Sequence, residues 1–270
     1  MSQDHLLRHL APISDRGWAL IDAEAAERIG VELGARRLVD FAGPHGWWHS
    51  ATSLGSTEPA PAVPVDGITV LRRRVLPLVE VKADFALSRQ QLQDYDRGAV
   101  ATDLGNLDDA VASMARIENM AVFHGWAGAG LTGITEATVH PDVPRVEDFN
   151  DYPGRIADAV DLLRRAGVGG PYGLAVGPAD YTAIVSAIDH GGLSVFRHVG
   201  EILEGPIVWT PGVHGGVVLS LRGGDFLFES GQDVSIGYDH HDAGQVHLYL
   251  EQSFSFRVAT PEAAVVLARK

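Results

Sequence analysis

The sequence has 270 residues, a formal net charge of −14 at pH 7 and no cysteine. This length suits one large domain or two small ones, and the lack of cysteine excludes disulfides, thiolate metal sites and cysteine nucleophiles. The acidic charge disfavours nucleic acid as a partner, because such binding depends on neutralising phosphates. The sequence shows neither a membrane-length apolar run nor the apolar stretch of a signal peptide at its start, which predicts a cytoplasmic protein without a membrane partner.

Residues 15–33 form the first predicted helix. Ser14 or Asp15 can cap its start, since both side chains accept hydrogen bonds from free backbone N–H groups. A short strand is expected over 37–41. The apolar side chains of the helix recur every three or four residues and make one stripe, which comprises Trp18, Ile21, Ala25, Ile29 and Leu33.

Residues 55–67 differ in kind from the helix before them. Pro59, Pro61 and Pro64 exclude a helix and a central strand. The stretch is therefore an extended arm or an exposed loop, and composition alone leaves a flexible linker as an equal alternative. Beyond it, strict alternation of apolar and polar residues predicts a half-buried strand over 79–87.

The second half of the chain mixes helical and strand-like periods. Because long helices and long strands stay apart instead of alternating strictly, the fold class is α+β. The clearest strand covers 246–258, where apolar and polar residues share opposite faces. The other expected elements are helices over 107–123, 155–166, 179–188, 196–203 and 261–268, and strands over 173–176, 207–210 and 217–221.

No motif in the sequence predicts a catalytic residue. Residues 128–133 fit the dinucleotide-binding pattern G-x-G-x-x-G, but a helix precedes them where the motif needs a strand, so a flexible turn explains these glycines. Two histidines between two aspartates over 239–242 could bind a metal, although a solvated hairpin loop is the favoured interpretation. We therefore predict no enzyme activity, no cofactor and no metal site.

Several segments together resemble one known family. They are the opening of the chain over 9–18, residues 34–44, residues 85–88, residues 170–172, residues 222–226 and, most specifically, Gly-Gln-Asp-Val-Ser-Ile-Gly-Tyr over 231–238. In order and spacing this set resembles the encapsulin shell proteins of family 1, also described as linocin-type bacteriocins. The resemblance covers about residues 5 to 265.

The resemblance implies the fold of tailed-phage major capsid proteins, which is α+β with a peripheral domain, an apical domain and an extended arm. On that basis residues 1–50 hold the first helix and the start of the peripheral domain, and residues 51–75 form the arm. Residues 76–135 continue the peripheral domain with its long spine helix. Residues 136–225 are mainly apical, and residues 226–270 return to the peripheral domain.

The implied function is that of a shell subunit. Copies of the chain would self-assemble into an icosahedral nanocompartment around a cargo enzyme, such as a dye-decolourising peroxidase or a ferritin-like protein. The family pattern also implies a groove for a peptide at the C-terminus of the cargo, formed by Ile29, Leu33, Arg36, Asp40, Asp233, Ile236 and Tyr238. It further implies a symmetry-axis pore in the loop 189–194, lined by Asp189, His190, Gly191 and Gly192.

Two alternatives stay open at this level. A prophage major capsid protein would share the fold but enclose DNA, and the acidic net charge favours protein cargo instead. A hydrolase or secreted bacteriocin is disfavoured because no nucleophile motif or signal peptide is recognised. Flavin, which binds to some relatives of the family, is not expected, because residues 89–92 provide no aromatic stacking surface.

Overall fold

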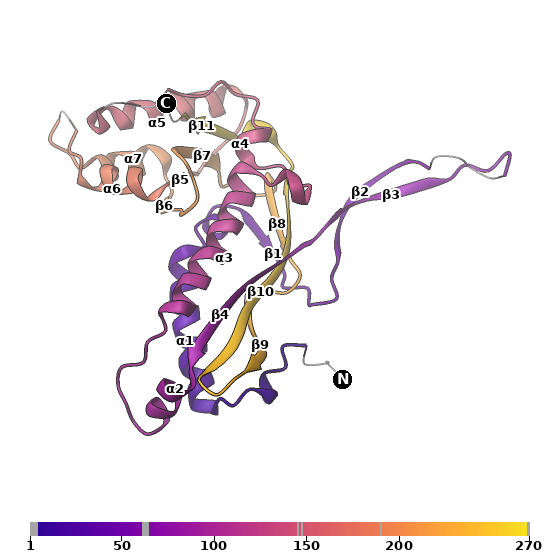
Figure 1. The fold of residues 1–270 in the computed structure, drawn as a ribbon. Helices are drawn as coiled ribbons and strands as arrows, with labels where there is room; N and C mark the ends of the chain where they lie inside the picture. Colours follow the sequence, from indigo (N-terminus) through magenta and orange to yellow (C-terminus); the bar gives the residue numbers. More distant parts are fainter. Residues whose placement is uncertain (1–4, 61–64, 145, 147, 190, 269–270) are drawn as a thin grey trace.

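We describe the protein from a computed structural model, which places residues 5–60, 65–144, 146, 148–189 and 191–268. Figure 1 shows three parts. A long, narrow body holds a twisted sheet with helices along one side. A second sheet with its own helices lies at one end of this body. A thin hairpin projects sideways from the long body.

The long sheet has β10 (Gln245–Val258) at its centre. This strand pairs antiparallel with β4 (Val79–Ser88), β8 (Phe226–Ser230) and β9 (Ser235–His241) at different points along its length. The short β1 (Asp40–Ala42) adds to β8 in parallel. Most of β10 is buried on both faces, which matches the long apolar face in its sequence and extends the burial to its polar face.

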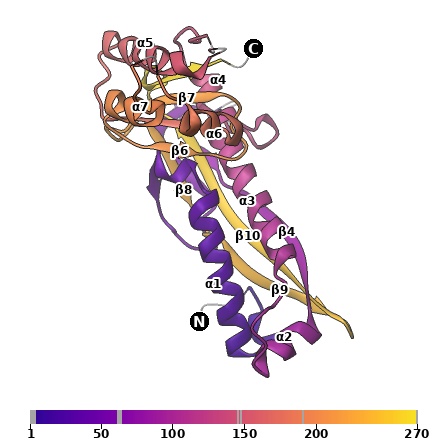
Figure 2. The ribbon, with the colours of Figure 1, turned by 90° about the vertical axis from the view of Figure 1, so that its left-hand side faces the viewer.

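Three helices cover one side of this sheet. They are α1 (Asp15–Glu32), α2 (Arg89–Asp96) and α3 (Gly105–His124). The expected cap of α1 is present, because the Ser14 hydroxyl accepts a 3.0 Å hydrogen bond from the Gly17 N–H. Figure 2 shows α1 and α3 running lengthwise along the sheet. The body is therefore a helix-on-sheet layer with a shared apolar core.

The second sheet has the order β11-β7-β5-β6 and is almost fully buried. Its elements and helices are α4 (Ile134–Ala137), α5 (Tyr152–Arg165), β5 (Tyr172–Val176), α6 (Pro178–Ser186), α7 (Val195–Leu203), β6 (Ile207–Trp209), β7 (Gly216–Ser220) and β11 (Ala264–Leu267). Short 3-10 turns occupy Arg8–Leu10, Ala35–Arg37, Ala127–Ala129, Phe149–Asp151 and Pro261–Ala263.

The projecting hairpin consists of β2 (Ala51–Pro59) and β3 (Leu71–Pro77), paired antiparallel. Pro59 stands at the end of β2, where its missing N–H interrupts no ladder. The other two prolines of the expected arm, Pro61 and Pro64, lie outside the described residues. The hairpin is largely exposed and carries solvent-facing apolar side chains, namely Val65, Ile68, Val70, Leu71 and Val75 in and beside β3.

The prediction of a helix over 261–268 is wrong. After one 3-10 turn, the chain forms β11, in which Val265 pairs with Val218 of β7. A short apolar run is compatible with a buried strand as well as with a helix. Here the edge of β7 provides backbone hydrogen-bonding partners, and the run pairs with it as a strand. The last described residues therefore lie in the second sheet, whereas the sequence analysis assigned all of 226–270 to the peripheral domain.

The expected hairpin loop over 239–244 is shorter than predicted. Strand β9 continues to His241, and only the residues after it turn. His240 therefore lies opposite His247 of β10, and their rings stack with centroids 4.1 Å apart.

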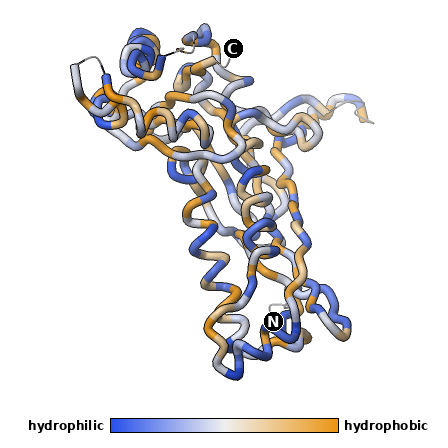
Figure 3. Tube along the Cα trace, turned by 60° about the vertical axis from the view of Figure 1, so that its left-hand side comes forward, coloured by the Kyte–Doolittle hydropathy of each residue, from blue (hydrophilic) through white to orange (hydrophobic). Residues whose placement is uncertain are grey.

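Figure 3 shows polar and apolar residues interspersed along the trace. Among the described residues, no helix is long and apolar enough to cross a membrane.

Candidate functional site

A hollow of about 280 Å³ lies between α1 and β9. Two of the predicted groove residues line it, Ile29 from α1 and Ile236 from β9. Ile236 is only 4% exposed and packs into the core, whereas Ile29 is half-buried and faces the hollow. The other lining residues are Leu6, Arg8, Asp22, Ala25, Ala26, Val234, Ser235 and Leu250. The structure thus brings together residues that are about 200 positions apart in the sequence.

The lining of the hollow mixes apolar side chains with the charged pair Arg8 and Asp22. Arg8 Nη2 donates a 2.7 Å hydrogen bond to Asp22 Oδ2, and the Arg8 guanidinium also lies 4.0 Å from the centre of the Trp18 ring. Strand β9 reaches the rim with a backbone edge, where Tyr238 N–H donates to Leu6 C=O. Alternate residues of a strand turn their backbone groups to the same side, so Ile236 presents its N–H and C=O toward this edge as well.

Two other predicted groove residues belong to the core. Leu33 is 6% exposed at the end of α1, and Tyr238 is 8% exposed with its hydroxyl 2.6 Å from His241 Nδ1. Neither lines the hollow. Both are therefore part of the packed interior of the subunit.

Arg36 and Asp233 form an internal ion pair. Arg36 donates two 2.8 Å hydrogen bonds to the two carboxylate oxygens of Glu118 and a 2.7 Å bond to Asp233 Oδ1. Glu118 on α3 has no exposed surface. Burial raises the pKa of the Glu118 carboxyl, and the Arg36 guanidinium opposes that rise. The guanidinium is therefore occupied within its own subunit, where it joins α3 to the segment before β9.

Asp40 lies at a different hollow. Its Oδ2 accepts a 2.6 Å hydrogen bond from the Gly224 N–H. The hollow it lines has a volume of about 170 Å³ and is bounded by residues 37–40 and by the β7–β8 connection. Asp40 therefore lines a different hollow from the one that Ile29 and Ile236 line.

The predicted pore loop connects α6 with α7. Asp189 Oδ1 accepts 2.9 Å hydrogen bonds from the N–H groups of Gly191 and Leu193, and Oδ2 lies 2.9 Å from His198 Nδ1. The backbone hydrogen bond from Leu193 and the contact with His198 lower the pKa of Asp189. Gly192 has φ +83°, a left-handed conformation that favours glycine. The side chain of Asp189 thus holds its own loop, and His190 lies outside the described residues.

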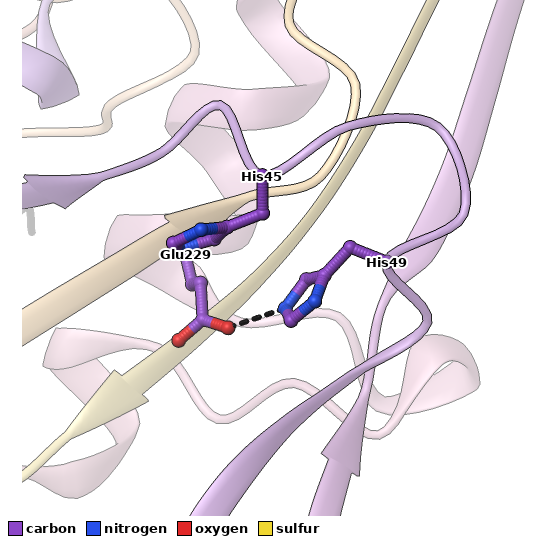
Figure 4. A group of neighbouring side chains, drawn as sticks. All are labelled: His45, His49 and Glu229. Atoms are coloured by element: carbon purple, nitrogen blue, oxygen red, sulfur yellow. Dashed lines mark hydrogen bonds and ion pairs between the residues drawn. The ribbon is translucent and has the colours of Figure 1, made fainter. Parts of the chain in front are cut away.

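Sequence analysis missed one polar cluster, which the structure forms from His45, His49 and Glu229 (Figure 4). The two histidines are four residues apart in a loop without regular structure, and the carboxylate is 180 residues further on. No local spacing rule connects such distant residues, so only the tertiary structure could show the cluster.

A body with one long sheet and lengthwise helices, a second sheet at its end and a projecting hairpin is the architecture of capsid-type shell proteins. Solved structures show the same fold. A virus-like particle from Pyrococcus furiosus superposes with a TM-score of 0.63 at 17% identity, covering 93% of this chain and 99% of that one. The capsid of an empty GTA particle gives a TM-score of 0.52 at 14% identity, covering 86% and 88%.

Residues 3–255 match the family described as encapsulating protein for peroxidase. The type 1 encapsulin shell protein of Rhodospirillum rubrum is 45% identical over 267 residues, which cover 97% of this chain and 95% of the relative. The corresponding protein of Mycobacterium tuberculosis is 36% identical over 265 residues, covering 98% and 99%. The chain belongs to this family, and it is a shell subunit of a protein nanocompartment. Its role is structural, as the sequence analysis expected.

Proposed function

We propose that the shell built from this chain encloses a peroxidase, and that each subunit holds a short peptide of that cargo in the hollow between α1 and β9. The family description supports the class of cargo, because it names an encapsulating protein for peroxidase. A ferritin-like protein stays an alternative from the sequence resemblance. The hollow that joins Ile29 with Ile236 is the observation on which the docking site rests.

The chemistry of the hollow suits an extended peptide with apolar side chains. Ile29, Ala26 and Val234 line the hollow with surface left exposed and offer apolar contacts to such side chains, whereas Arg8 and Asp22 suit polar groups. The edge of β9 can add backbone hydrogen bonds. One such contact is weak, but a multimeric cargo that reaches many identical grooves on one wall is held by avidity.

The test is co-expression of the shell protein with a peroxidase that carries its native C-terminal segment. Ile29→Asp places a carboxylate in the hollow and should give intact shells with little co-purifying peroxidase activity. Ala26→Phe should fill the same hollow from an exposed position without disturbing the core. Val31→Asp is the matched control, because Val31 is 60% exposed on the same helix and does not line the hollow.

Shells of normal shape that lack cargo in both groove variants, but not in the control, would support the docking site. Full shells in both variants would show that the cargo binds elsewhere. Ile236→Asp is less informative, because Ile236 is nearly buried and its replacement also disturbs the core. Electron microscopy of the particles distinguishes a failure of loading from a failure of assembly.

We also propose that the loop 189–194 lines an opening at a symmetry axis. The left-handed conformation of Gly192 and the hydrogen bonds that Asp189 accepts from Gly191 and Leu193 support a turn that several copies could bring close to one axis. Replacing Asp189 by alanine should loosen this loop and change the rate at which small ions reach an enclosed enzyme. An unchanged rate would place the opening elsewhere. The cytoplasmic location stays a prediction.

A further inference from the structure

Three side chains with metal-binding atoms meet where the hairpin arm leaves the body. One donor atom from each of His45, His49 and Glu229 lies within 4.8 Å of the other two (Figure 4). His49 Nε2 is 2.6 Å from Glu229 Oε1, and the rings of His45 and His49 have centroids 4.8 Å apart. A simple hydrogen-bonded pair would explain His49 and Glu229, but it would not explain the third donor from His45.

The backbone holds the three residues in place. Glu229 belongs to β8, where it pairs with Ala42 of β1. The loop then continues along β8, because His45 N–H donates a 3.0 Å hydrogen bond to Ser230 C=O. Gly43 has φ +115°, and a β-carbon there would lie 2.4 Å from the Ser230 carbonyl oxygen, so this close approach requires glycine.

A turn brings the second histidine back to the first. His49 N–H donates a 3.0 Å hydrogen bond to Gly46 C=O, which folds the loop so that both rings face Glu229. The side chains of His49 and Glu229 keep 28% and 22% of their surface exposed, and His45 is exposed. An ion can therefore reach the donors from solvent.

The donor set is that of a zinc-type site. Two imidazole nitrogens and one carboxylate oxygen are common ligands of Zn²⁺, with bond lengths of about 2.0–2.2 Å and a fourth position left to water. Bonds of this length place donors around a tetrahedral ion about 3.4 Å apart. The three donors already lie within 4.8 Å, so small side-chain rotations are enough to reach this arrangement.

We propose that His45, His49 and Glu229 bind one divalent transition-metal ion per subunit, of the class to which Zn²⁺ belongs. The ion would join the loop 43–50 to β8 by bonds that cross the root of the arm. Leu78 N–H already donates to Ser50 C=O at this root, which connects the two strands of the arm to each other. A bound ion would therefore fix the direction of the arm relative to the long sheet.

The chain contains twelve histidines, so the control must separate this cluster from ordinary surface binding. His240 and His247 supply it. Their rings stack at 4.1 Å, and Asp239 lies 2.8 Å from His240. Within the described part of the chain, however, His45, His49 and Glu229 form the one group of three such donors at this spacing.

The experiment uses assembled shells of the full chain without a histidine purification tag, stripped with a chelator. Zn²⁺ binding is measured by calorimetry, and Co²⁺ is added as an absorption probe of the coordination. The wild type should bind one ion per subunit with the visible spectrum of low-coordinate Co²⁺. His45→Gln and Glu229→Gln should each weaken binding at least about tenfold, whereas His240→Gln should leave it unchanged.

A second readout is stability. Zn²⁺ should raise the midpoint of thermal unfolding of the wild type and of His240→Gln, and should leave that of His45→Gln unchanged, because only a competent site gains free energy by binding. Since His45 is exposed, His45→Gln decides the question even if Glu229→Gln fails to fold. Equal Zn²⁺ affinity in wild type and His45→Gln, no stoichiometric binding to the wild type, or loss of binding in His240→Gln would overturn the proposal.

Discussion

The long sheet and the arm use the same backbone device with opposite results. Strands β4 and β10 pair antiparallel from Phe254 opposite Val79 to Gln245 opposite Ser88, and most of β10 is buried. Strands β2 and β3 also pair antiparallel, but their hairpin projects from the body (Figure 1), and their residues are exposed or half-exposed. The hydrogen-bond pattern is similar, and the difference is the burial.

This difference shows where each part obtains its stability. A backbone hydrogen bond contributes little net free energy, because the unfolded chain bonds to water instead, and an isolated two-stranded hairpin is marginal. Buried apolar area stabilises the body within one subunit. The arm, with Ile68, Val70 and Leu71 facing solvent, lacks such area within one subunit, and we propose that it obtains it from a neighbouring copy.

The largest effect is expected at an ion pair of the body. Arg36→Met removes the partner of Glu118, which is fully buried, and should destabilise the protein by about 3–5 kcal/mol. Arg72 and Glu58 form the corresponding pair on the arm, where Arg72 is 68% and Glu58 is 37% exposed, so Arg72→Met should change little. Chemical unfolding at one subunit concentration, followed by tryptophan fluorescence, compares the two variants.

A second substitution tests whether the uncompensated Glu118 carboxylate causes this loss of stability. Adding Glu118→Gln to Arg36→Met removes the uncompensated charge and should recover part of the loss. If Arg36→Met and Arg72→Met were equally mild, burial would not distinguish the two regions, and the comparison would fail.

A smaller effect is expected with pH at the end of α3. Burial, and then the neighbouring His214, lower the pKa of His124, whose Nε2 accepts a 3.1 Å hydrogen bond from the His214 N–H. The folded state therefore binds this proton less readily than the unfolded state. Its stability contribution is complete above the unfolded pKa of about 6.5 and is lost as the pH falls through the lower folded pKa.

His124→Gln should consequently reduce the loss of stability between pH 7.5 and pH 5. The matched control is Val31→Gln, which introduces the same side chain at an exposed position of α1 and removes no titratable group, so it should retain the wild-type pH profile. Unfolding midpoints at a series of pH values check both. A wild-type profile in His124→Gln would show that burial of this ring does not matter.

The smallest effect on subunit stability is expected in the arm, together with the largest effect on assembly. Leu71→Asp replaces a side chain that is 56% exposed and should alter subunit unfolding by less than about 0.5 kcal/mol. If a neighbouring copy covers this apolar surface, as proposed above, the charge should nevertheless prevent closed particles. Leu71→Met keeps the surface apolar and is the control at the same position.

Light scattering and electron microscopy give the outcome. Closed shells of normal yield from Leu71→Asp would mean that the arm does not pair with a neighbour at this position. Loss of particles in Leu71→Met as well would point to a precise steric fit instead of apolar burial.

Local sequence determined the elements whose period repeats several times. The helices over 15–33 and 107–123 and the strand over 246–258 were predicted, because a long stripe of side chains specifies both the element and its buried face. The prolines from residue 59 onward excluded a helix but left an extended arm, an exposed loop and a flexible linker open, and the structure shows a strand that ends at Pro59. The apolar pattern of residues 261–268 is too short to specify a helix or a strand. Pairing with the edge of β7 decided its conformation.

Tertiary structure alone decided which residues meet. Ile29 and Ile236 line one hollow, whereas Arg36 bonds inward to Glu118 and Asp40 lies elsewhere, although all were predicted for the same groove. His45, His49 and Glu229 converge only because β1 pairs with β8 and the loop turns back. The physical reason is that periodicity reports contacts within a few residues, while a site is made by chain packing between segments that share no local pattern.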